Sequence, residues 1–377
     1  MPSWSGARER LDSFLACTGI GRKGMPTVIT GSIQASPARQ LVDGHFQRRE
    51  WQQALDALES ILRGGEGRPS DLLLRARILT NMKRYEDAIA QAHNAAAALG
   101  DSAGIANVLK TCHFHLGAVE EAIAHGQSAI ERRDRDSCEA LAPVSLSRND
   151  SGKDVIAFSL WGARDAYCLG AAINASLCPY IYPGWQARFY VGADVPARIV
   201  GMLRNAGAEI VTGDPDVPSY FWRFLVMNDP GVRRFLCRDT DARLSSREAC
   251  MVQEWIESGQ SFHVIRDHVL HSELILAGMW GGHATDSISL AELMRARATN
   301  AYGSDQSFLA REIWPRLRGE VCVHDLFYAT PGLPSRRSTA NVGEDHVGAG
   351  RQDDASVRRE WARLRGEPAP KAVTGLS

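Results

Sequence analysis

Hydrophobic positions recur every three to four residues in the first third of the chain, and they form short continuous runs in the second half. One phrase occurs three times at an interval of 34 residues, as Trp51-Gln-Gln-Ala-Leu, Tyr85-Glu-Asp-Ala-Ile and Val119-Glu-Glu-Ala-Ile. A periodic phrase of this length predicts three two-helix units, whose second helices begin at Trp51, Tyr85 and Val119.

The first helix of each unit is expected over 41–47, 72–81 and 103–116. The period and the phrase resemble the tetratricopeptide repeat, a helix-turn-helix unit. Stacked units of this kind form a curved surface, so the repeats are expected either to bind a protein partner or only to support the next domain. The charged run 131–136 is expected to be a solvated helix end.

Apolar runs alternate with helical patterns from residue 154 onward. Strands are expected over 155–161, 187–191, 209–211, 235–237 and 262–265. Ser245, with Glu248 three residues later, predicts a capped helix over 246–258. This alternation indicates an α/β domain with a largely parallel sheet, in which ligands bind beyond the carboxyl ends of the strands.

The changes of pattern divide the chain into five spans. We expect a flexible N-terminal segment at 1–35, helical repeats at 36–136, a linker at 137–153, an α/β domain at 154–330, and a partly disordered tail at 331–377. The tail is expected to contain a short helix over 357–364.

Composition narrows the class of protein. At 377 residues the chain is long enough for two domains. Its net charge of -1 provides no field that would attract nucleic acid, so no nucleic-acid partner is expected. The eight Cys form no C-x-x-C pair, which suits free thiols in a reducing compartment. With no signal peptide and no transmembrane segment in the sequence, a cytoplasmic location is expected, and any membrane association would be peripheral.

The strongest candidate for chemistry is Asp239-Thr240-Asp241, which follows the apolar run 235–237. In extended backbone, residues i and i+2 point the same way, so the two carboxylates can converge on one cation. Their hard oxygen atoms suit Mn²⁺ or Mg²⁺, ions that often hold the phosphates of a nucleotide. A solvated turn after a strand is the alternative.

Further motifs follow Asp239-Thr240-Asp241 in a defined order. They are the apolar, Gly-containing segment 274–282, Asp305-Gln306 at the start of a helical pattern, and His324 near the end of the domain. This order resembles the GT-A class of nucleotide-sugar glycosyltransferases, particularly the glycogenin-like members. The resemblance covers residues 155–330.

The resemblance implies a role for each matching residue. Asp239, Asp241 and His324 would bind the cation, and through it the diphosphate of a nucleotide-sugar donor. Asp305 and Gln306 would face the sugar, with Asp305 acting as general base if the reaction inverts, or stabilising the cation-like sugar if it retains. Donor contacts would come from two arginines and two aromatic residues: Arg223, Arg238, Trp161 and Tyr167. The acceptor would be a carbohydrate, a lipid-linked molecule or a protein.

The stretch 266–271 and Trp280 each have more than one interpretation. The stretch is an active-site loop in which Asp267 and His268 touch sugar or acceptor hydroxyls, a separate zinc site, or a plain turn. Asp267 is accordingly a candidate catalytic residue. Trp280 is either a wall that stacks on the sugar or part of the core.

Two other functions compete with glycosyl transfer. In the first, the repeats form a protein-binding scaffold and the α/β domain is inactive. In the second, the protein is a nucleotidyltransferase, which would usually carry a Gly-rich, basic loop after the first strand. Residues 159–164 contain only one Gly and one Arg, which disfavours that function.

Overall fold

The structure is a computed structural model, and it describes residues 36–141, 144–299, 303–336 and 346–367. The predicted flexible segment 1–35 therefore lies outside the described residues, as do two parts of the predicted tail.

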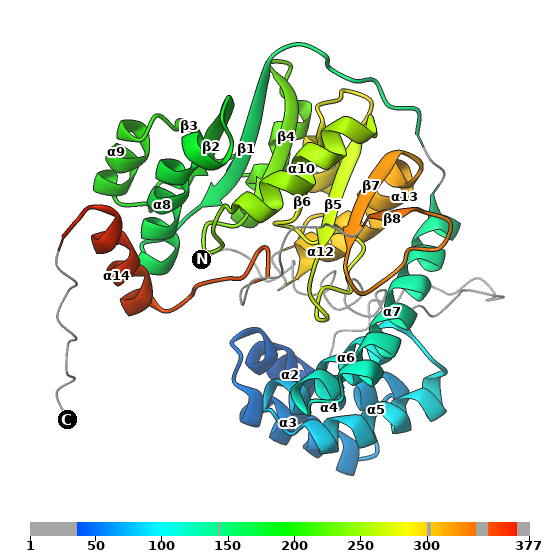
Figure 1. Cartoon of the computed structure of the whole chain (residues 1–377). Helices are drawn as coiled ribbons and strands as arrows, with labels where there is room; N and C mark the ends of the chain where they lie inside the picture. The colour runs from blue at the N-terminus through cyan, green and yellow to red at the C-terminus, as the bar shows by residue number, and fades with distance from the viewer. Residues whose placement is uncertain (1–35, 142–143, 300–302, 337–345, 368–377) are drawn as a thin grey trace.

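The N-terminal region consists of helices arranged in three consecutive pairs (Figure 1). They are α2 (Pro37–Gln47), α3 (Trp51–Arg63), α4 (Pro69–Asn81), α5 (Tyr85–Leu99), α6 (Ala103–His115) and α7 (Val119–Ala140). The second helix of each pair begins at the residue that the 34-residue period predicts. The alanines of the repeated phrase, Ala54, Ala88 and Ala122, are fully buried, because a small side chain lets neighbouring helices approach closely. Whether the units belong to the tetratricopeptide class stays a prediction.

The charged run near the end of α7 differs from expectation. It is solvated only in part, because Glu131, Arg135 and Asp136 are exposed whereas Asp134 is buried, and α7 continues to Ala140. Asp134 accepts hydrogen bonds from Trp314 Nε1 (2.7 Å) and from Arg318 Nε (2.7 Å). A buried carboxylate needs such partners, and here they fasten α7 to the second half of the chain.

The described residues of the second half form an eight-stranded sheet in the order β3-β2-β1-β4-β6-β5-β7-β8. The strands are β1 (Lys153–Leu160), β2 (Trp185–Val191), β3 (Glu209–Thr212), β4 (Val232–Arg238), β5 (Phe262–Arg266), β6 (Trp280–His283), β7 (Val321–Asp325) and β8 (Ser335–Arg336). β6 pairs antiparallel with β4 and β5, and every other pairing is parallel. The predicted α/β class with a mostly parallel sheet is confirmed, while the GT-A class stays a prediction.

Helices cover both faces of the sheet and bury two apolar cores (Figure 1). One face packs against α8 (Asp165–Ile181), α9 (Ala197–Asn205), α10 (Ser246–Ser258) and α14 (Asp354–Leu364). The other packs against the 3₁₀ segment η2 (Ser219–Asn228), α11 (Leu290–Arg297), α12 (Ser304–Phe308), η3 (Leu309–Ile313) and α13 (Trp314–Leu317), which η4 (Arg318–Glu320) follows. α10 has the predicted bounds, and the Ser245 side chain accepts the Glu248 amide as its cap.

The helical region contacts the loop that follows β5. Lys110 of α6 is buried, and its Nζ donates to Asn107 Oδ1 (2.8 Å), to the Leu270 carbonyl (2.9 Å) and to Ser272 Oγ (2.8 Å). Arg133 of α7 donates to the Ser272 carbonyl at 2.7 Å. These bonds hold the loop against the repeats.

We expect Lys110→Met to change how stability depends on pH. Burial lowers the pKa of Lys110 from 10.5 to about 7 in the folded protein. Between about pH 7 and 10.5 the unfolded chain binds a proton that the folded chain has released. The free energy of unfolding therefore rises with pH in this window, by at most about 1.4 kcal/mol per pH unit. Below pH 7 Lys110 is protonated in both states, and the folded protein bears the full free-energy cost of burying the charged ammonium group.

Urea unfolding of the wild type and of Lys110→Met across this window measures the difference. The free energy of unfolding should rise less steeply with pH in Lys110→Met than in the wild type. Lys83→Met changes an exposed lysine and should keep the wild-type slope. Parallel profiles for the wild type and Lys110→Met would contradict the assignment.

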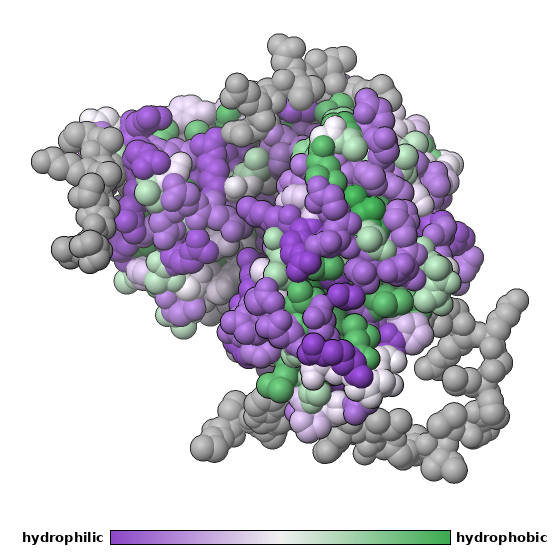
Figure 2. All heavy atoms as spheres, turned by 90° about the horizontal axis from the view of Figure 1, so that it is seen from below, coloured by the Kyte–Doolittle hydropathy of each residue, from purple (hydrophilic) through white to green (hydrophobic). Residues whose placement is uncertain are grey.

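Seen from the side of the helical region, the surface is mostly hydrophilic, and its apolar residues gather in a narrow strip (Figure 2). Exposed Leu41, Leu116 and Val119 belong to this region. No helix among the described residues has the length and apolar character needed to cross a membrane.

Candidate functional site

The carboxyl ends of several strands meet at one edge of the sheet. β1, β4 and β5 run in the same direction, because β6 is antiparallel to both β4 and β5. Trp161 follows β1, Asp239 follows β4 and Asp267 follows β5, so all three lie along this edge. It is the edge at which open α/β sheets bind ligands.

Arg223 connects two of the predicted site residues. Its guanidinium lies 2.8 Å from Asp239 Oδ1 and 3.4 Å from Asp305 Oδ2, and its Nε donates to the Ala277 carbonyl at 3.2 Å. Arg223 is buried in η2, and Asp305 lies in the first turn of α12, as predicted. Three segments of the chain, the last of them 82 residues after Arg223, thus converge on one charged cluster.

Burial raises the pKa of Asp305, while the positive charge of Arg223 acts against that rise. Burial favours the protonated acid, whereas the adjacent guanidinium favours the carboxylate and holds it in place. Asp239 is more open, with 41% of its side chain exposed. The cluster therefore has one enclosed and one accessible carboxylate.

Gly278 makes room for Asp239. A Cβ atom at this position would lie 1.9 Å from Asp239 Oδ2, so any other residue would displace the carboxylate. The predicted Gly-containing segment 274–282 therefore passes close to Asp239 at Gly278.

Asp241 contacts a segment that the sequence did not connect with it. We call residues 346–352 the strap. Asp241 Oδ2 accepts a hydrogen bond from Gln352 Nε2 (3.1 Å), and the Asp241 carbonyl accepts the Arg351 amide (2.8 Å). Burial, and next the charge of Asp239, raise the pKa of Asp241.

Two aromatic side chains lie at the same edge. Trp161 is 41% exposed, and its ring centroid is 6.3 Å from that of Tyr220. The pKa of Tyr167 is raised by burial and next by the charge of Asp241, so this residue lies within electrostatic range of that carboxylate. Both residues are positioned to border a ligand held there.

Arg238 and His324 do not join this cluster. Arg238 is buried with its Nε 3.2 Å from Glu248 Oε1 of α10. His324 is buried between Glu254 Oε2 of α10 and His263 Nε2, at 2.8 Å from each. Both side chains therefore point to the α10 face, whereas Asp239 pairs with Arg223 of η2, which lies on the other face.

The remaining candidates, Asp267, Gln306 and Trp280, lie in three different surroundings. Asp267 contacts Arg247, the Val347 amide and His271, and none of its contacts is shared with Asp239 or Asp305. Gln306 follows Asp305 in α12 and is partly buried. Trp280 belongs to the core, where it packs edge-on against Phe224 and Phe235.

The donor set at Asp239 and Asp241 suits a cation that is completed by its ligand. In the part of the chain that is described, no group of three His, Cys, Asp or Glu side chains able to share an ion includes either aspartate. Two carboxylates fit the binding mode of Mg²⁺ and Mn²⁺, in which waters and substrate phosphates fill the other positions.

Comparison with known proteins adds little to these observations. No known family profile matches the chain, and no curated protein sequence is significantly similar to it. Among solved structures, a mutant of the O-GlcNAc transferase of Thermobaculum terrenum aligns at 13% identity with a TM-score of 0.29. The alignment covers 50% of this chain and 43% of that chain.

Proposed function

We propose that the protein is a metal-dependent glycosyltransferase that uses a nucleotide-sugar donor. The observation that carries this proposal is the bridge from Arg223 to Asp239 and Asp305. It brings the residue proposed to act at the sugar next to the pair proposed to hold the diphosphate. This is the relation that transfer from a diphosphate leaving group requires.

Each residue of the cluster has a distinct role in this proposal. Asp239 and Asp241 hold Mn²⁺ or Mg²⁺, which supplies Lewis-acid stabilisation of the departing diphosphate. Arg223 holds the Asp239 and Asp305 carboxylates at fixed positions on either side of its guanidinium and offsets part of their charge. Asp305 faces the sugar, as a base in an inverting reaction or as a stabilising charge in a retaining one.

The donor site is bordered by residues at the same edge of the sheet. Trp161 and Tyr167 offer aromatic faces to the base or ribose, and the strap lies beside Asp241. Arg238 and His324 are left out of the proposed site, because they face α10. The repeats are proposed to present the acceptor or to bind a protein partner.

A thermal-shift screen of nucleotide-sugars with and without Mn²⁺ tests the proposal. One class of donor should raise the midpoint of unfolding only when the ion is present. At a donor concentration of 100 times Kd, the stabilisation should be about 2.7 kcal/mol.

Hydrolysis of the same donor in the presence of Mn²⁺ should follow. The absence of any donor-dependent shift or hydrolysis would instead favour the protein-binding scaffold. A shift with free nucleoside triphosphates but not with nucleotide-sugars would favour the nucleotidyltransferase.

A further inference from the structure

Three histidines outside the proposed glycosyl-transfer site meet at the same edge of the sheet. His268 and His271 lie in the loop after β5, and His346 begins the strap. The ring centroid of His346 is 4.5 Å from that of His268 and 4.7 Å from that of His271. One ligand nitrogen from each ring lies within 4.8 Å of those of the other two.

We propose that His268, His271 and His346 bind one divalent transition-metal ion of the zinc type. Three imidazoles with a further open position form a common donor set for Zn²⁺. The proposed site is distinct from the carboxylate pair, and it does not rest on the proposed function.

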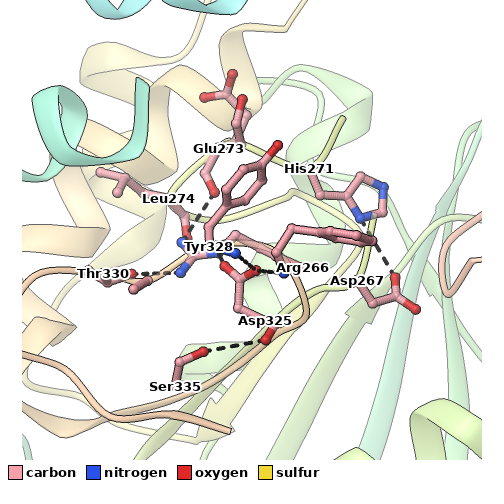
Figure 3. Close-up of polar contacts among 12 residues, drawn as sticks. Arg266, Asp267, His271, Glu273, Leu274, Asp325, Tyr328, Thr330 and Ser335 are labelled. Carbon is pink, nitrogen blue, oxygen red and sulfur yellow. Dashed lines mark hydrogen bonds and ion pairs between the residues drawn. The ribbon is translucent and has the colours of Figure 1, made fainter. Parts of the chain in front are cut away.

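Asp267 provides the first argument for the site. Asp267 Oδ1 and His271 Nδ1 are both buried and have no hydrogen-bond partner, although they face each other at 3.7 Å (Figure 3). If Nε2 of His271 holds an ion, its Nδ1 carries a proton directed at this carboxylate. A carboxylate behind a histidine ligand is the usual way in which a metal site orients the ring.

His346 provides the second argument. Its Nδ1 lies 3.0 Å from the carbonyl oxygen of Val347, so this nitrogen donates and Nε2 keeps a free lone pair. The amide of Val347 in turn donates to Asp267 Oδ2 at 3.0 Å. Asp267 therefore supports His271 directly and His346 through the strap.

His268 is the ligand that has to rearrange. Its Nδ1 accepts the Leu270 amide at 3.1 Å, which leaves the proton of the neutral ring on Nε2. To bind an ion, the ring turns about its Cβ–Cγ bond or gives up this hydrogen bond. The Phe114 ring of α6 packs edge-on against it, with the ring centroids 5.2 Å apart, and limits how far it moves.

The surroundings favour neutral imidazole, which is the form that binds metals. Burial lowers the pKa of His268 to about 4 and lowers that of His271 well below its ordinary value. Arg247, 3.0 Å from Asp267 Oδ2, and Lys110 add positive charge nearby. Positive charge opposes every cation, so the site selects ions that bond strongly to imidazole, such as Zn²⁺, over Mg²⁺.

The proposed ion would lie close to Asp239 and Asp241. β4 and β5 are two strand positions apart in the sheet, or about 10 Å. His346 is four residues from Gly350, which adjoins Asp241, so the strap spans at most about 14 Å between the two sites. An ion on the three histidines would fasten the strap to the β5 loop and so steady the strap residues that contact Asp241.

Titration with Co²⁺ and Zn²⁺ tests the site directly, using the full-length chain without a histidine tag after treatment with a chelator. We expect one tightly bound Co²⁺ per chain, with visible absorption bands but no thiolate-to-cobalt charge-transfer band, and displacement of this Co²⁺ by Zn²⁺. His271→Gln and His346→Gln should each lower the affinity for Co²⁺ by about 100-fold or more. This loss is larger than the one expected when a residue only supports a metal ligand.

Two controls separate this site from other sources of binding. His113→Gln removes a ring that stacks on His125 at 5.2 Å, outside the three-histidine group, and should leave the affinity unchanged. Asp241→Asn should also leave it unchanged, since it alters only the carboxylate pair. Far-ultraviolet circular dichroism checks that each variant is folded. If His271→Gln does not fold, His346→Gln alone tests the site. Absence of binding, a thiolate band, or equal affinity in His346→Gln would overturn the proposal.

Discussion

Asp241→Ala is expected to lower metal-dependent turnover of a nucleotide-sugar by about 100-fold or more, because it removes half of the carboxylate pair that holds the cation at the leaving diphosphate. The loss should appear in the rate with Mn²⁺ and in the Mn²⁺ affinity together. Activity assays over a Mn²⁺ titration, with the donor found in the thermal-shift screen, measure both.

The same substitution should leave the protein folded. Burial and the neighbouring charge of Asp239 raise the pKa of Asp241, so its ionised form is disfavoured in the folded protein. Removing this carboxylate relieves that strain, and the midpoint of thermal unfolding should not fall. Asp216→Ala, at an exposed carboxylate, is the matched control and should leave turnover unchanged. Full activity of Asp241→Ala, or of the wild type in excess chelator, would remove the aspartate pair from the mechanism.

Arg266→Met is expected to destabilise the protein by about 3 to 5 kcal/mol. Arg266 and Asp325 are both fully buried, and Arg266 Nε lies 2.6 Å from Asp325 Oδ2 (Figure 3). The guanidinium also donates to Thr330 Oγ1 (2.6 Å) and to the Leu274 carbonyl (3.2 Å). Without it, the Asp325 carboxylate is left buried, and its remaining side-chain partners among the described residues are the amides of Phe327 and Tyr328.

Chemical denaturation of three variants tests this origin of the effect. Asp325→Asn combined with Arg266→Met should recover part of the lost stability, because the uncompensated charge is gone. Arg84→Met removes an exposed ion pair with Asp87 and should change stability by no more than about 1 kcal/mol. A small effect of Arg266→Met, or no recovery in the double variant, would show that the pair is not a major source of stability.

Much of the fold could be predicted from local patterns. The repeated phrase placed the starts of α3, α5 and α7, because helix periodicity and the 34-residue interval are both properties of the chain itself. The Ser245 cap placed α10 for the same reason. The burial at the end of α7 could not be predicted. Asp134 is buried there by Trp314 and Arg318, which lie about 180 residues further along the chain.

The candidate site divides in a similar way. Asp239 and Asp241 could be found because a strand that ends in two acidic residues is a local signal. Arg238, next to Asp239, was expected to contact the donor, but its side chain faces Glu248 of α10, because successive residues of a strand point to opposite faces. His324 likewise faces α10, where Glu254 and His263 bind both of its ring nitrogens. The face toward which each of these side chains points depends on how its strand lies in the sheet, which the local sequence does not show.

The sequence by itself thus determined the three helix pairs, the strands β1 to β5, the mostly parallel sheet and the acidic pair at the end of β4. These follow from periodicity, caps and apolar runs, which act over a few residues. Only the tertiary structure decided that Arg223 joins Asp239 to Asp305, and that His346 meets His268 and His271. Those contacts join segments that packing brings together over long stretches of chain, and no local pattern records them.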